Sequence, residues 1–117
     1  MLKEIVIPIR TVSESNMREH WSAKHRRHKK QKGIVLMYLR HNGEIQLPCT
    51  VKMIRRSKRM LDDDNLIGSM KAVRDAIADF IIPGLAPGRA DDNKTIRWQY
   101  DQVKGDHAVI VQVFPPC

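Results

Sequence analysis

The organising stretch of this chain, residues 61–66, reads LDDDNL and places three neighbouring carboxylates in a protein of net charge +8. Like charges this close repel one another, so their ionised form needs a cation beside it. A hard divalent ion with oxygen ligands is the simplest such partner. The basic run directly upstream, residues 55–59, would attract a polyanion to the same place. Carboxylates for a metal beside arginines for phosphate are the groups that metal-dependent cleavage of a nucleic acid requires.

The patterns on either side predict a strand leading into this stretch and a helix leading out of it. Residues 47–55 alternate apolar and polar side chains, as a half-buried strand does. Residues 65–81 repeat apolar side chains at helical spacing, and Asp64 or Asn65 is placed to cap that helix. We therefore expect the carboxylates at the end of a strand, where a sheet holds them rigidly.

The remaining patterns predict an α+β fold. Residues 2–12 and 96–100 alternate as strands, residues 17–41 form a basic helix with an apolar end, and residues 108–114 form a last strand. The last two strands are expected to pair as a hairpin. The order β-α-β-α-β-β predicts one domain over residues 1–117, with a small mixed or antiparallel sheet of about four strands and helices packed on it.

Composition limits the possible partners and compartments. The chain is 42% hydrophobic and 29% charged, which suits a globular protein. No apolar run approaches the ~20 residues of a membrane span, and the N-terminus lacks the layout of a signal peptide. Two cysteines, one in a strand pattern and one at the last residue, form no disulfide framework. We therefore expect a cytoplasmic protein with no membrane partner.

Basic residues dominate the first half of the chain and acidic residues the second. Residues 1–61 hold 15 Lys and Arg against four Glu, whereas residues 62–117 hold six against nine Asp. This asymmetry and a sequence pI of about 9.9 favour a nucleic-acid partner, the alternative being a merely solvated basic surface. The residues predicted to contact DNA are Arg26, Arg27, Lys29, Lys30, Arg55, Arg56, Lys58, Arg59 and Lys71.

Two further features belong to the predicted site. Asp91 and Asp92 follow a loop rich in Pro and Gly, just before the third strand. Brought back to the first cluster they would complete a metal site; the alternative is a turn or capping pair. Lys71, on the helix face opposite the apolar stripe, is placed to reach a scissile phosphate. Its alternative is a surface ion pair with Asp75.

In these motifs the chain resembles the RusA family of Holliday junction resolvases. The resemblance covers about residues 55–100 and rests on four elements in order. They are the basic run 55–59, Asp-x-Asp-Asn-Leu at 62–66, Lys-Ala-x-x-Asp-Ala-Ile at 71–77 and Asp-Asp at 91–92. The interval between the first acidic motif and the lysine is longer here than is typical of the family.

The resemblance implies a RusA-like fold and a Mg²⁺-dependent endonuclease, with Mn²⁺ as a substitute. Such an enzyme acts as a homodimer that nicks two strands of a four-way DNA junction during recombination and repair. The catalytic and metal-binding carboxylates would be Asp62, Asp64 and Asp92, with Asp91 as a further metal ligand. Lys71 would be an essential, positively charged catalytic residue. The source would be a bacterium or a phage-infected host.

Two other functional classes remain open at this point. One alternative is a structure-specific DNA-binding module whose carboxylates no longer catalyse hydrolysis. The other is a metal-dependent nuclease for other branched or single-stranded DNA.

Overall fold

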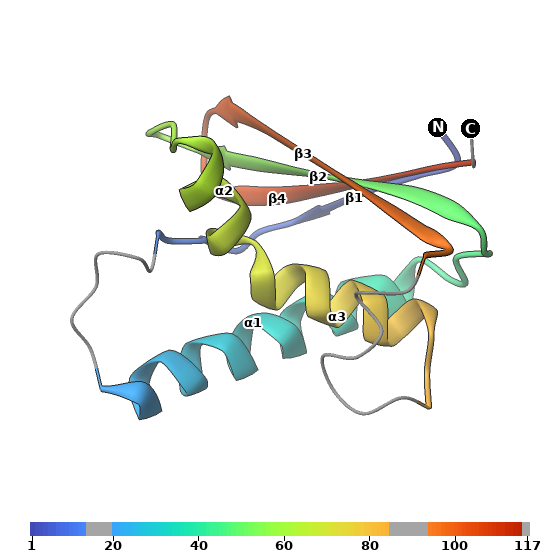
Figure 1. Cartoon of the computed structure of the whole chain (residues 1–117), viewed down its shortest axis with the longest axis horizontal. Coiled ribbons are helices and arrows are strands. Elements are labelled where there is room, and N and C mark those ends of the chain that lie inside the picture. The colour runs from blue at the N-terminus through green and yellow to red at the C-terminus, as the bar shows by residue number, and fades with distance from the viewer. Residues whose placement is uncertain (14–19, 85–93, 116–117) are drawn as a thin grey trace.

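The computed structural model describes residues 1–13, 20–84 and 94–115 and contains a four-stranded mixed sheet and three helices (Figure 1). Helices α1 and α3 lie against one face of the sheet, and α2 stands at one end of it. This arrangement confirms the predicted small α+β fold. The elements in chain order are β1 (Lys3–Ile7), α1 (Trp21–His41), β2 (Cys49–Ser57), α2 (Asp63–Ser69), α3 (Lys71–Ile81), β3 (Ile96–Lys104) and β4 (Ala108–Phe114).

The strands lie in the order β1-β4-β2-β3, so the predicted hairpin of the last two strands is wrong. β3 pairs in parallel with β2, while β4 pairs antiparallel with both β2 and β1. The turn from β3 to β4 passes over the end of β2, where the Gly105 amide donates to the Ser57 carbonyl at 3.1 Å. A Cβ on Gly105 would lie 2.9 Å from Cδ of Arg56, so glycine suits this crossing. Alternation predicts which side chains face inward, but not which strands are neighbours.

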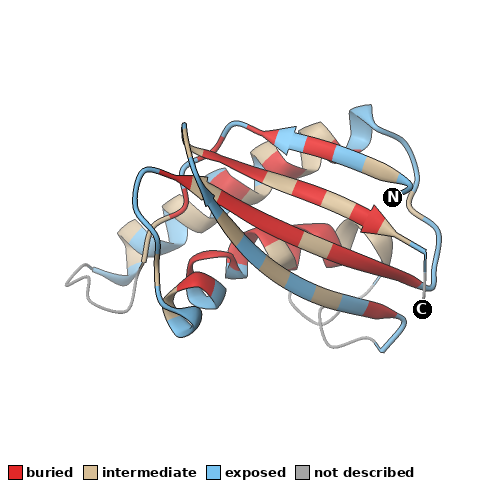
Figure 2. Cartoon of the chain, turned by 90° about the horizontal axis from the view of Figure 1, so that it is seen from above, coloured by how far each residue is buried: buried red, intermediate tan, exposed pale blue. Residues whose placement is uncertain are grey.

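The hydrophobic core lies between the sheet and the helices. Alternate residues of the strands face the helices and are fully buried, among them Ile7, Val51, Met53 and Val111. The other face is turned towards the viewer in Figure 2, where β3 alternates half-buried and exposed residues. Within the described ranges the helices therefore cover one side of the sheet, which agrees with its alternating sequence pattern.

Only the second half of α1 packs against the body of the protein. Its buried residues are Gln31, Val35 and Leu39, and no residue from 21 to 30 is buried. This basic first half extends beyond α3 in Figure 1. Across the described ranges, no helix is both long enough and apolar enough to cross a membrane.

The single helix predicted over residues 65–81 is two helices that meet at Met70. The side chain of Met70 is fully buried, and its amide donates to the Ile67 carbonyl at 3.1 Å. The Ser69 hydroxyl donates to the Leu66 carbonyl at 2.7 Å, a local bond of the kind that competes with regular helix. The apolar stripe continues across the break, so periodicity alone did not reveal it.

Candidate active site

The candidate site lies where three strands end. Because β1 and β2 are both antiparallel to β4, and β3 is parallel to β2, these three strands run in the same direction. The segments that follow β1 and β2 therefore leave the sheet at the same edge. The acidic stretch follows β2 at this edge, as the sequence predicted.

The three adjacent carboxylates open helix α2. Asp62 is the N-cap, and its Oδ1 accepts the Asn65 amide at 2.9 Å. The predicted caps, Asp64 and Asn65, are wrong because the helix begins earlier, at Asp63. Asp63 and Asp64 occupy the first turn, where the helix dipole favours negative charge. All three are exposed, and none forms an ion pair with any residue that the structure describes.

A side chain that the sequence analysis missed holds the backbone just before the acids. The Gln102 amide accepts from the Leu61 amide at 2.9 Å and donates to the Leu61 carbonyl at 2.6 Å. These two bonds attach the residue before Asp62 to β3. Gln102 shares the inward face of β3 with Trp98 and Tyr100. A polar residue at such a position was the signal available in the sequence.

A second contact, also missed, connects the acidic helix to the segment after β1. The Ser13 hydroxyl donates to Oδ1 of Asn65 at 2.8 Å. Asn65 is the asparagine of the Asp-x-Asp-Asn-Leu motif. Its bond to Ser13 helps to orient the helix that carries the acidic residues. The acidic stretch is thus held from both sides, by β3 and by residue 13.

Two arginines of the basic run point to opposite faces of the sheet, because β2 extends to Ser57 and side chains alternate along a strand. Arg55 is 6% exposed and donates through Nε and Nη2 to the side chain and carbonyl of Thr11, and through Nη1 to the carbonyl of Arg59. Burial, followed by the like charge of Arg10, lowers the pKa of Arg55. Arg55, predicted to contact DNA, is therefore committed mainly to internal bonds.

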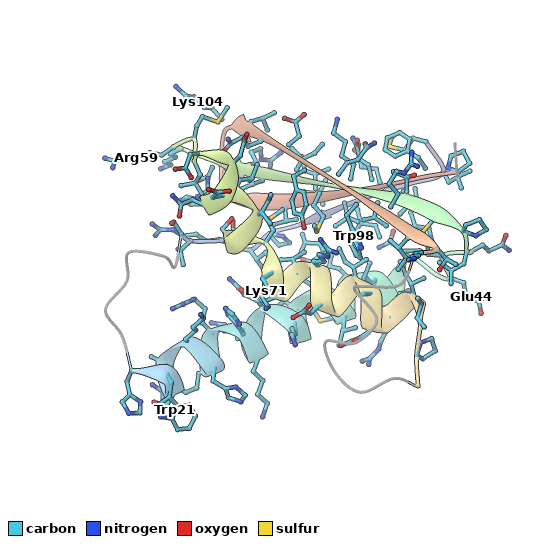
Figure 3. The ribbon with its side chains drawn as sticks, viewed as in Figure 1. Trp21, Glu44, Arg59, Lys71, Trp98 and Lys104 are labelled. Carbon is cyan, nitrogen blue, oxygen red and sulfur yellow. The ribbon has the colours of Figure 1, made fainter. Side chains whose placement is uncertain are left out.

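The rest of the basic run is more accessible. Arg56 is half-buried, and its Nε donates to the Asp106 carbonyl at 2.8 Å on the far side of the sheet. Lys58 and Arg59 follow the strand and are exposed, and Figure 3 shows Arg59 extending away from the body. Of the four basic residues predicted here to bind DNA, Lys58 and Arg59 are the two presented beside the acids.

Lys71 is the first residue of α3 and is exposed (Figure 3). The alternative ion pair with Asp75 is not formed, and Lys71 pairs with no carboxylate among the described residues. Asp75 is buried, and its carboxylate lies 3.8 Å from Nζ of Lys32, which connects α3 to α1. Lys71 thus has a free ammonium near the corner between α2 and α3.

The basic helix forms one side of a charged hollow. Arg26, Lys29 and Lys30 are exposed, and Arg27 is half-buried. A hollow of about 300 Å³ is lined by Arg27, Lys30 and Arg10, and Arg10 also lines a larger pocket of about 430 Å³ beside the acidic stretch. None of the described residues that line either hollow is acidic. Arg10 therefore connects the basic residues of α1 to the basic residues that follow β2. The sequence did not show that these two groups are joined.

The second acidic pair, Asp91 and Asp92, lies outside the described residues. The chain re-enters the sheet at Thr95, whose carbonyl accepts the Cys49 amide at 3.0 Å. Cys49 starts β2, whereas the first acidic cluster follows its end, so β3 begins at the opposite edge of the sheet. In the part of the chain that the structure describes, no three His, Cys, Asp or Glu side chains gather closely enough to hold a metal ion.

No family model, curated protein or solved structure matches this chain.

Proposed function

We propose that this chain is a metal-dependent endodeoxyribonuclease that resolves four-way DNA junctions as a cytoplasmic homodimer. The observation that carries the proposal is the edge of the sheet where β1, β2 and β3 end. Three exposed carboxylates without a described cationic partner stand there, directly after a residue that lines the larger basic pocket. The described lining of this pocket contains no acidic residue, and the pocket shares Arg10 with the second basic hollow. The RusA-like motifs favour a four-way junction as the substrate. Because such a junction has two symmetrically placed DNA strands to cut, a dimer is favoured.

The donor set suits a hard divalent cation. Asp62 keeps Oδ2 outside its capping bond, and Asp64 is exposed in the first turn of α2. Carboxylate oxygens are the ligands that Mg²⁺ takes in proteins, and Mn²⁺ accepts them too. Asp62 and Asp64, with Asp92 and Asp91, would hold the ion. When bound, it supplies Lewis acidity and an activated water for phosphodiester hydrolysis.

The cationic side chains would hold the DNA and neutralise its phosphates. Lys58, Arg59 and Lys71 are the exposed basic residues nearest in sequence to the acids and would bind the cleaved strand. Arg10, which both hollows share, would continue this path to α1, where Arg26, Arg27, Lys29 and Lys30 contribute further positive charge. Affinity for DNA should therefore fall steeply as the salt concentration rises. The bonds from Arg55 to Thr11 and to the Arg59 carbonyl also hold the segment after β1 beside the segment after β2.

A structure-specific DNA-binding module is the second candidate. It is favoured because, within the described ranges, no three His, Cys, Asp or Glu side chains gather closely enough to hold a metal ion. Such a module would use the same basic surface without hydrolysis.

Cleavage of a labelled synthetic four-way junction tests the proposal. The junction and a linear duplex of the same sequence are incubated with Mg²⁺ or with chelator. Asp64→Asn removes a predicted ligand, and Asp101→Asn is the matched control, since that exposed carboxylate lies on β3 and pairs with Lys52. We expect paired nicks near the crossover that need Mg²⁺, disappear in Asp64→Asn and persist in Asp101→Asn.

Three other outcomes would contradict part or all of the proposal. Tight junction binding without cleavage, unchanged by Asp64→Asn, would identify the binding module. Equal cleavage of linear duplex would retain the nuclease and remove the resolvase. Preference for flaps or single strands over junctions would identify a nuclease for other branched DNA.

A further inference from the structure

A basic pocket of about 430 Å³ separates the segment after β1 from the segment after β2. This volume lies within the ~300–1,000 Å³ range of ligand pockets. Residues 10–13 form one wall, and residues 57–61 form the other. Its lining includes Arg10, Ser13, Arg55, Lys58, Arg59 and His107. Four of these carry a fixed positive charge, and none of the lining residues within the described ranges is acidic.

The buried charge of Arg55 is the main evidence that this pocket takes an anion. Its side chain forms no ion pair with any described residue; its three bonds go to Thr11 and to the Arg59 carbonyl. A guanidinium has five N–H groups, so two remain to be donated. A charge this buried is ordinarily paired, because removing it from water is costly. Here the like charge of Arg10 acts on the Arg55 guanidinium and makes its burial still less favourable.

We infer that this pocket binds a phosphate group of the nucleic acid, adjacent to the one that the carboxylates attack. Guanidinium groups match the oxygens of phosphate in a planar fork. Arg55 and Arg10 supply two such groups, and Lys58 adds a point charge. The inference deepens the proposed function and rests on it for the identity of the bound polymer.

The position of the pocket explains why its ligand would be a neighbouring phosphate on the same strand. Leu61, which lines the pocket, is the residue directly before Asp62. Ser13, on the opposite wall, bonds Asn65 in the helix that carries the carboxylates. A strand with one phosphate in the pocket therefore passes the acidic cluster with the next. The pocket would set the position of cleavage relative to the bound strand.

Calorimetry with a short oligodeoxynucleotide in chelator tests this inference without any cleavage. The probes are inorganic phosphate, oligothymidylate without terminal phosphate, and the same oligomer with a 5′-phosphate. Arg10→Gln removes an exposed pocket charge, so folding is not at risk. Arg40→Gln is the matched control, because it removes the same charge at the far end of α1. Binding by Asp64→Asn is measured in parallel.

We expect Arg10→Gln to weaken oligomer binding about tenfold, the loss typical of one charge-assisted hydrogen bond, and Arg40→Gln to leave it nearly unchanged. A gain from the 5′-phosphate that Arg10→Gln abolishes would identify a terminal phosphate as the ligand. Equal binding of both oligomers would identify an internal phosphodiester. Equal weakening by Arg10→Gln and Arg40→Gln would overturn the inference, because only general electrostatics would then be at work.

The two proposals fail separately in this design. Asp64→Asn should bind the oligomer as the wild type does and yet lack cleavage. If the wild type never cleaves but Arg10→Gln still selectively weakens binding, the nuclease is lost and the phosphate pocket stands. If cleavage is present but Arg10→Gln binds normally, the pocket is lost and the nuclease stands.

Discussion

The substitution Gln102→Met tests whether β3 positions the acidic cluster. Methionine keeps the length and approximate shape of glutamine but removes both bonds to the Leu61 backbone. Gln102 does not belong to the acidic cluster and lines neither basic hollow, so DNA affinity should not change. The segment before Asp62 should lose its attachment to the sheet. The expected result is a lower rate of cleavage at nearly constant binding.

The magnitude follows from the two lost hydrogen bonds. Each hydrogen bond contributes about 0.5–1.5 kcal/mol net to stability. Because the site is half-buried, water can replace part of the lost hydrogen bonding. The unfolding free energy should therefore fall by about 1–2 kcal/mol. For a chain of this size the thermal midpoint should fall by roughly 4–10 °C. A displacement of the carboxylates by ~1 Å can cost up to about 100-fold in rate, so we expect kcat to fall between about tenfold and 100-fold.

Thermal unfolding, junction binding and single-turnover cleavage measured together distinguish the possible roles. Gln99→Met is the matched control, because Gln99 lies on the same strand but is exposed on its opposite face. It should change neither stability nor rate. Loss of stability with normal cleavage would make Gln102 a purely structural residue. Normal stability together with normal cleavage would refute the positioning argument altogether.

Three further predictions concern the acids, the basic helix and the buried thiol. About 23 Å of extended strand separates Thr95, which follows Asp92 by three residues in the sequence, from Gln102, which bonds the residue before Asp62. We therefore expect the two acidic groups to combine between the subunits of the proposed homodimer. Mixing inactive Asp64→Asn with inactive Asp92→Asn should then restore junction cleavage, and a mixture that stays inactive contradicts this. The variant Trp98→Phe keeps one tryptophan, Trp21, which is 73% exposed at the start of the basic half of α1. Its fluorescence should change when DNA binds, and an unchanged spectrum would show that this half of α1 is not part of the DNA interface. Burial raises the pKa of the Cys49 thiol, so the unfolded thiol ionises first and the unfolding free energy should fall as pH rises above ~8.5. Cys49→Val should lack this component of the pH dependence, and an identical dependence in both proteins would disprove it.

Local patterns predicted the secondary structure well because they report directly on burial. The alternating residues of β2 and β4 face the core, and the helical stripe from Leu66 to Ile77 is buried as expected. The charge pattern likewise predicted that the acidic residues follow a strand and that basic residues lie beside them. The same patterns failed wherever two arrangements bury the same residues. The break at Met70 and the separation of β3 from β4 by β2 leave the inward face of each element unchanged.

The sequence by itself therefore determined the helices and strands, their inward faces and the presence of an acidic cluster in a basic chain. Periodicity and charge are local properties, and each can be counted along the chain. Tertiary structure alone decided that Arg55 is buried while Arg56 faces the other side, and that Gln102 and Ser13 hold the acidic stretch. It also brought Arg10 beside Arg55, far apart in the chain, to enclose one pocket. Such contacts depend on strand order and register, which follow from how all the elements share one core.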